Sequence, residues 1–99
     1  MLDFSRLNSL LRASAVLDRL ALPATVVYGL TWRGKCPFHA SGNPKSRSLH
    51  VDLGRNVWFC HKCRRGGNLI GLWADVRAVT MYAAAHQIAA EFGFYPERE

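Results

Sequence analysis

Two short pairs of metal-ligating residues constrain the fold of this 99-residue chain more than any other feature of its sequence. Cys36 and His39 form one ligand-x-x-ligand pair, and Cys60 and Cys63 form the other. This spacing lets one tight turn direct two side chains at one ion, and the 20 intervening residues allow a hairpin to bring the turns together. Three thiolates and one imidazole suit tetrahedral zinc, and four protein ligands leave no position for a substrate. The pairs therefore predict one structural Zn²⁺ ion.

The fourth ligand is chosen among four histidines. His61 lies inside the second turn, where the intervening residues normally point outward. His50 lies in an expected strand without a second ligand at the x-x spacing, and His86 lies on an expected helix. His39 is therefore the expected ligand. A chain this short buries only about two-thirds of its unfolded surface, so zinc binding would supply folding free energy that the small core lacks.

Residues 1–23 and 66–95 are expected to be helical. Apolar residues recur every three or four positions over 3–22, with a break near Ala13 and Ser14 as the cap of a second short helix. Gly66 and Gly67 indicate a turn. The later helices are expected to start after the caps Asn68 and Thr80, with the last one ending at Gly93.

Residues 24–65 are expected to form the zinc ribbon. The stretch 25–28 is β-branched and aromatic, and 47–53 alternates polar and apolar residues before a turn and a returning strand at 56–60. Residues 40–46 have a loop composition. We therefore expect one zinc-binding domain over residues 1–99, of the α+β class, with a small antiparallel sheet flanked by N-terminal and C-terminal helices.

Basic residues concentrate around the metal ligands. The formal net charge is +6 and the pI is about 9.8. Residues 32–67 hold eight basic residues and one acid, together with four aromatic residues. Cations that hold phosphates and rings that stack on bases are typical of single-stranded DNA binding. The expected DNA-contacting residues are Arg47, Arg55, Trp58, Lys62, Arg64 and Arg65.

Two alternatives stay open on this surface. The basic residues could form a solvated face with the aromatic residues in the core. Phe38 and Phe59 are expected to be buried, and the exposure of Trp58 is left undecided because it alternates with Val57 and Phe59 along one strand.

The acidic residues argue against an enzyme. Of the seven, only Glu97 and Glu99 lie within three positions of each other, so the carboxylate cluster that two-metal phosphoryl transfer needs is not evident. No apolar run approaches the roughly 18 residues of a membrane span. Three cysteines cannot all pair within one chain, which favours a reducing, cytoplasmic location.

Three segments carry a family resemblance: residues 34–39 (Gly-Lys-Cys-Pro-Phe-His), 58–63 (Trp-Phe-Cys-His-Lys-Cys) and 66–70 (Gly-Gly-Asn-Leu-Ile). They resemble the N-terminal zinc-binding domain of bacterial-type (DnaG-like) DNA primases. The four ligands match that family's ligands one for one. Two features depart from the family pattern: the loop after His39 is a few residues longer, and Lys62 stands where the family usually has a glycine.

The resemblance implies a module that holds single-stranded template and supports RNA primer initiation in DNA replication, while a separate Toprim-type domain carries the chemistry. The implied protein partners are a primase polymerase domain or a replicative helicase. The alternative is a zinc-ribbon adaptor that docks on a polymerase, helicase or transcription protein. The chain could be an excised primase domain or a complete small phage or plasmid protein.

Overall fold

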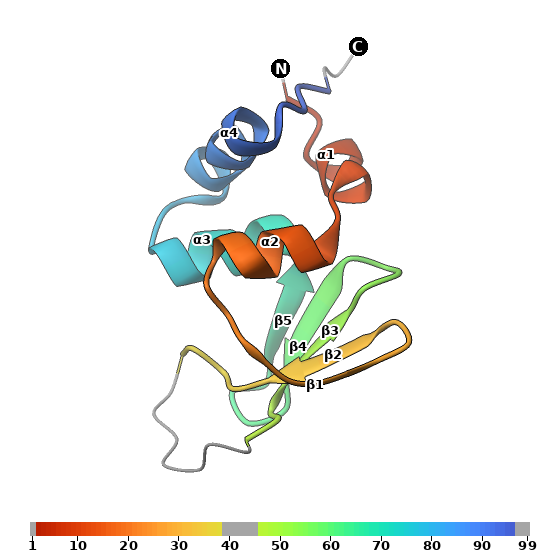
Figure 1. The fold of residues 1–99 in the computed structure, drawn as a ribbon. Coiled ribbons are helices and arrows are strands. Elements are labelled where there is room, and N and C mark those ends of the chain that lie inside the picture. The colour runs from red at the N-terminus through yellow and green to blue at the C-terminus, as the bar shows by residue number, and fades with distance from the viewer. Residues whose placement is uncertain (1, 39–45, 97–99) are drawn as a thin grey trace.

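The computed structural model describes residues 2–38 and 46–96 (Figure 1). Within these ranges helices and strands follow one another as α1 (Phe4–Leu10), α2 (Ala13–Arg19), β1 (Ala24–Tyr28), β2 (Thr31–Gly34), β3 (Leu49–Asp52), β4 (Val57–Cys60), β5 (Arg65–Asn68), α3 (Leu69–Arg77) and α4 (Met81–Phe92). The expected α+β class, with helices on both sides of the ribbon in the sequence, is confirmed. His39 and most of the loop at 40–46 lie outside the described residues.

The five strands form one antiparallel sheet in sequence order, β1-β2-β3-β4-β5. Trp32, Val51 and Trp58 occupy one row across β2, β3 and β4, and all three side chains are buried. Arg33, His50 and Phe59 occupy the neighbouring row, which points to the opposite face because side chains alternate along a strand. We call these the inner face and the outer face of the sheet.

The four helices gather at one end of the sheet, and the two ends of the described chain lie beside each other above them (Figure 1). Their buried side chains join the inner face in one apolar core that runs from α1 through Trp58 and α3 to α4. The backbone N–H of Asp3 donates to the carbonyl of Pro96 at 2.8 Å, which ties the two termini together. In the part of the chain that the structure describes, no helix is long and apolar enough to span a membrane.

Local signals predicted the later helices well. The side chain of Asn68 accepts from the N–H of Gly71 and begins α3, and Thr80 accepts from Ala83 N–H to begin α4. Gly93 ends α4 with a φ of 73°, a left-handed conformation that glycine adopts without strain. The expected caps and the expected end of the last helix are confirmed.

The N-terminal helical segment breaks as expected, but its second helix starts earlier. Helix α2 begins at Ala13 after Arg12, which makes no side-chain capping hydrogen bond. Ser14, the expected cap, therefore lies inside the helix. The start of α2 is set by burial of Ala13, Val16 and Leu17 rather than by a cap.

Two of the five strands were not expected from the sequence. Strand β2 follows Gly29 and ends at Gly34, and β5 contains the Gly66–Gly67 pair that indicated a turn. Both glycines of β5 pair with β4. A Cβ atom on Gly66 would lie 2.6 Å from the carbonyl oxygen of Trp58, so this strand needs glycine for close backbone approach.

A buried asparagine fastens the sheet to the first helices. Asn56, in the turn between β3 and β4, is 7% exposed and has a φ of 57°. Its side-chain amide donates to the carbonyls of Asn8 at 2.8 Å and Leu11 at 2.7 Å. Asn8 returns a hydrogen bond to the Asn56 carbonyl at 3.2 Å. These contacts give the Leu11 carbonyl, just past the end of α1, a partner, and they add a second donor to the Asn8 carbonyl, which also accepts from the N–H of Leu11.

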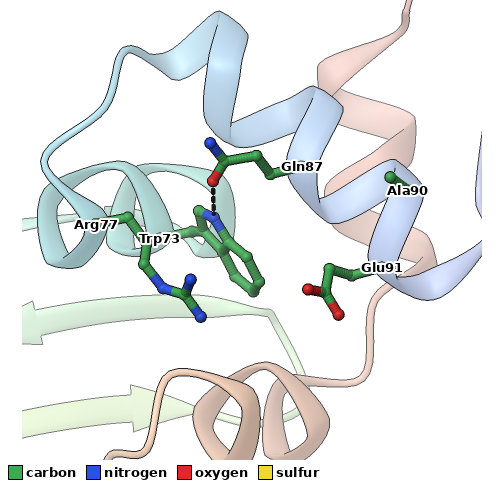
Figure 2. Close-up of a pocket in the computed structure, with 5 residues that line it drawn as sticks. All are labelled: Trp73, Arg77, Gln87, Ala90 and Glu91. Atoms are coloured by element: carbon green, nitrogen blue, oxygen red, sulfur yellow. Dashed lines mark hydrogen bonds between the residues drawn. The ribbon is translucent and has the colours of Figure 1, made fainter.

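Helices α3 and α4 enclose a groove of about 500 Å³ (Figure 2). The indole N–H of the buried Trp73 donates to Gln87 Oε1 at 2.9 Å. The guanidinium of Arg77 lies 4.7 Å from the centre of the Trp73 ring and donates to the Arg19 carbonyl. Since Arg19 also pairs with Glu91 at 3.2 Å, these polar contacts join α2, α3 and α4 around the core.

Candidate metal centre

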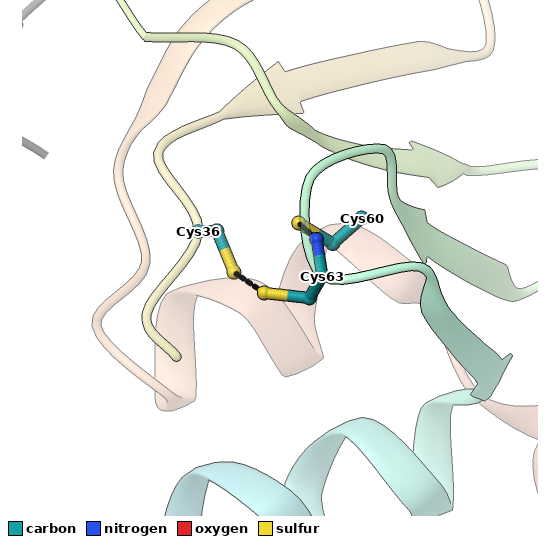
Figure 3. Close-up of side chains that lie close together, drawn as sticks. All are labelled: Cys36, Cys60 and Cys63. Carbon is teal, nitrogen blue, oxygen red and sulfur yellow. Dashed lines mark hydrogen bonds between the residues drawn. The ribbon is translucent and has the colours of Figure 1, made fainter. Parts of the chain in front are cut away.

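Three cysteine side chains converge from two loops (Figure 3). Cys36 follows β2, Cys60 ends β4, and Cys63 lies in the turn after it. The three sulfur atoms all lie within 4.8 Å of one another, and Cys36 Sγ is 3.7 Å from Cys63 Sγ. Cys36 and Cys60 are buried, and Cys63 is half-buried. Sulfur atoms at this separation can share a single ion.

Backbone N–H groups point at these sulfur atoms from both turns. The N–H of Phe38 donates to Cys36 Sγ at 3.4 Å, and the N–H of Cys63 donates to Cys60 Sγ at 3.3 Å. Each bond runs from a residue two or three positions further along the chain, as the x-x spacing predicts. Such donors stabilise a thiolate, so the turns are built for anionic sulfur ligands.

The pKa values of the thiols indicate what is needed to ionise all three cysteines. Burial raises the pKa of Cys36 to about 12, an effect that the Phe38 N–H partly offsets. Burial also acts to raise the pKa of Cys60, but the N–H groups of Cys63 and Lys62 and the neighbouring thiol of Cys36 outweigh it and hold that pKa below its usual value. Three thiolates therefore require a cation among them. Zn²⁺ fits this donor set because it binds thiolate tightly and deprotonates it on binding.

Arg65 ties the metal turns to the helices. Its guanidinium pairs with Asp75 of α3 at 2.8 Å and lies 4.6 Å from the centre of the Phe38 ring. Phe38 in turn contacts Trp58, with ring centres 5.5 Å apart. An Arg65 held in this way has less freedom to meet a phosphate than the sequence suggested.

The structure corrects the expected stacking role of Trp58. This side chain is only 4% exposed, because it points to the inner face and packs in the core. It offers no open ring face to a base. Phe59, expected in the core, points to the outer face and is 42% exposed, whereas Phe38 is half-buried against the core.

The other expected DNA-contacting residues are exposed but do not form one cluster. Arg55 lies in the β3–β4 turn, at one end of these two strands. Arg47 precedes β3, and Lys62 and Arg64 lie in the second metal turn; the pairing of Leu49 with Cys60 puts these three cations at the other end. The four residues of β4 span about 13 Å, so these cations border the outer face at both of its ends.

Four residues on or next to the outer face were not among the expected DNA-contacting residues: His50, Phe59, His61 and Arg33. The rings of His50 and His61 are stacked with centres 6.3 Å apart, and Phe59 meets His61 edge-on at 5.2 Å. Arg33, opposite His50 in the register, donates two hydrogen bonds to the Arg47 carbonyl. The alternation of side chains along β3 and β4 puts His50 and Phe59 on a different face from their neighbours, but it does not indicate which face the helices cover.

Comparison with known proteins places this centre in a family. The model of the CHC2 zinc finger, the zinc ribbon of DnaG, matches residues 13–99. The DNA primase of Myxococcus xanthus is 31% identical over 71 residues, 72% of this chain and 11% of that protein. The DNA primase of Geobacillus stearothermophilus is 31% identical over 65 residues, 66% of this chain and 10% of that protein. The chain thus spans about a tenth of the length of these relatives.

A solved structure shares the fold. The crystal structure of the Aquifex aeolicus primase, comprising zinc binding and RNA polymerase domains, superposes with a TM-score of 0.80 over 98% of this chain and 23% of that chain, at 23% identity. The family model covers most of the chain and all three clustered cysteines. The chain therefore belongs to the CHC2 zinc finger family, the zinc-binding domains of DnaG-like DNA primases, and its cofactor is a structural zinc.

Proposed function

We propose that residues 1–99 act as one zinc-binding domain that holds single-stranded DNA template and supports primer initiation by a primase. Cys36, Cys60 and Cys63 supply three zinc ligands in this proposal, and His39 supplies the fourth. With all four positions taken by protein, the ion has a structural role and shapes the two turns. A cytoplasmic location belongs to the same proposal, since cysteines outside disulfides are typical of a reducing compartment.

The outer face is the observation that carries this proposal. It combines an exposed phenyl ring at Phe59, the imidazoles of His50 and His61, and arginines at its margins. Aromatic rings on a sheet with cations around them are how proteins hold single strands, because rings stack on bases and cations meet phosphates. The zinc centre adds about one negative charge, so the cations here are not needed to neutralise a larger acidic site.

Salt-dependent binding to a labelled oligonucleotide tests the proposal. If about four phosphates are neutralised, log K should fall with log salt at a slope of about −3. Arg64→Ala should reduce the slope by somewhat less than about one unit, since one phosphate contact is lost. Asp18→Asn, on the exposed side of α2, is a control that should leave the slope unchanged. Absence of binding at low salt would contradict the proposal and favour the protein adaptor.

The chain alone is proposed to be accessory to synthesis rather than catalytic. The purified protein with template, Mg²⁺ and ribonucleotides should make no primer, because the acids of this sequence are scattered. Primer synthesis should require a separate polymerase domain, which together with a replicative helicase is the proposed class of protein partner. Nucleotide incorporation by the isolated chain would overturn this part of the proposal.

A further inference from the structure

A small hollow opens on the outer face between β3 and β4. It measures about 150 Å³ and is lined by His50, Asp52, Val57, Trp58 and Phe59. Two directly opposed pairs form its walls, His50 with Phe59 and Asp52 with Val57. Trp58 contributes backbone, since its side chain points to the inner face. Pockets for drug-sized ligands measure about 300–1,000 Å³, so this hollow suits one flat ring rather than a whole nucleotide.

The aromatic wall of the hollow is held in place from behind. A Cβ atom on Gly66 would lie 2.9 Å from Cδ2 of Phe59, so the phenyl ring rests against the backbone of β5. The imidazole of His61 contacts the ring edge-on. Because these neighbours restrict the ring, stacking a base on it costs little side-chain entropy.

The two oxygens of the Asp52 carboxylate differ in how closely they are bound. Oδ1 accepts from the backbone N–H groups of Gly54 and Arg55, at 3.0 Å each. Oδ2 lies 4.0 Å from Arg55 Nε, at the long limit of an ion pair. An asparagine would serve the turn as well. The turn therefore does not explain a negative charge on a face proposed to meet a polyanion.

We propose that this hollow holds one nucleobase of the bound strand and that Asp52 selects a base with an amino group on its pairing edge. The proposal rests on single-stranded DNA binding, the function proposed above. A carboxylate accepts a hydrogen bond from the N4 amino group of cytosine. Uracil and thymine present a carbonyl oxygen there, which the carboxylate repels. Arg55, which is exposed beside Asp52, is placed to meet a flanking phosphate.

Homo-oligomers of deoxycytidine and deoxyuridine test the selection, because their bases differ only at the pairing edge. We would measure fluorescence anisotropy of labelled 12-mers with the zinc-loaded 99-residue protein at pH 7.5 and fixed salt. The cytosine oligomer should bind about fivefold more tightly, the lower end of the range for one good base contact. In Asp52→Asn, Oδ1 can keep both turn hydrogen bonds while an N–H donor replaces Oδ2, so the preference should disappear or reverse.

Controls separate this inference from the function on which it rests. Asp18→Asn removes the same charge far from the hollow and should keep the fivefold preference. Phe59→Ala should weaken binding of both oligomers. Equal affinity of the wild type for both oligomers would overturn base selection and leave DNA binding intact, whereas no binding of either would overturn both. If Asp52→Asn lost its zinc or its fold, the wild-type comparison would still decide.

Discussion

Two adjacent residues of β4 provide the sharpest test of the sheet's two faces. Trp58 points into the core and is 4% exposed, whereas Phe59 points outward and is 42% exposed. Trp58→Ala removes a buried indole and its contact with Phe38, and substitutions of this kind cost about 3–5 kcal/mol of unfolding free energy. In a domain of this size each kcal/mol corresponds to about 4–8 °C. The melting temperature should therefore fall by at least about 12 °C.

Phe59→Ala should have little effect on stability and should weaken binding to single-stranded DNA. Roughly half of the ring is already in solvent, so its removal should cost only about 1 kcal/mol of stability. Binding to single-stranded DNA should weaken by about 1–3 kcal/mol if the ring stacks on a base. The salt slope should not change, because no charge is removed.

Thermal unfolding at saturating zinc and anisotropy with a labelled oligonucleotide measure both effects on the same samples. The free zinc concentration must be held constant, because a ligand of the folded state shifts the melting temperature. The reasoning is refuted if Trp58→Ala melts within about 4 °C of the wild type and loses DNA affinity while Phe59→Ala keeps it. That result would mean that the covered and open faces of the sheet are assigned the wrong way round.

Three further predictions concern the metal centre and the hydrogen bonds of Asn56. Cys60→Ser should abolish the content of about one zinc per chain seen by metal analysis, and a metal-free protein with an unchanged fold would contradict a structural role for zinc. Zinc affinity should fall by at least about tenfold for each unit of pH lowered below neutrality, because every protonated thiol ligand must lose a proton to bind, and Cys36 has its pKa raised to about 12. A pH-independent affinity in competition with a chelator would contradict thiolate ligation. Asn56→Ala should lower the free energy of unfolding by about 2–4 kcal/mol, because two hydrogen bonds are lost and alanine is strained at a left-handed φ. In urea unfolding, Asn56→Gly should be about 1 kcal/mol more stable than Asn56→Ala, because glycine adopts this φ without strain. Equal stability of the two variants would contradict the contribution of the backbone conformation.

The parts of the fold that the sequence predicted depend on local chemistry. The pairing of Cys60 with Cys63, the caps at Asn68 and Thr80, and the end of α4 at Gly93 each involve residues within about four positions of one another. The alternation of Leu49 and Val51 with polar residues likewise predicted β3 and its buried side. Such signals are visible without knowledge of the tertiary structure.

The parts that were missed depend on distant contacts. Strand β5 has two glycines at its centre and little strand propensity, and it forms because β4 offers it a partner. The side-chain hydrogen bonds of Asn56 join residues more than 40 positions apart. Neither contact leaves a pattern in the local sequence, so only the tertiary structure reveals them.

Strand β4 connects the metal centre with the proposed DNA surface. Cys60 and Trp58 point inward, to the zinc ligands and the core, while Phe59 and Val57 point outward to the hollow. A slip of one residue in the pairing of β4 would exchange these two sets. It would also carry Cys60 away from Cys36 and Cys63, so bound zinc opposes the slip. The ion therefore stabilises the register that presents Phe59 to solvent, although the ion lies on the other side of the strand from the proposed base site.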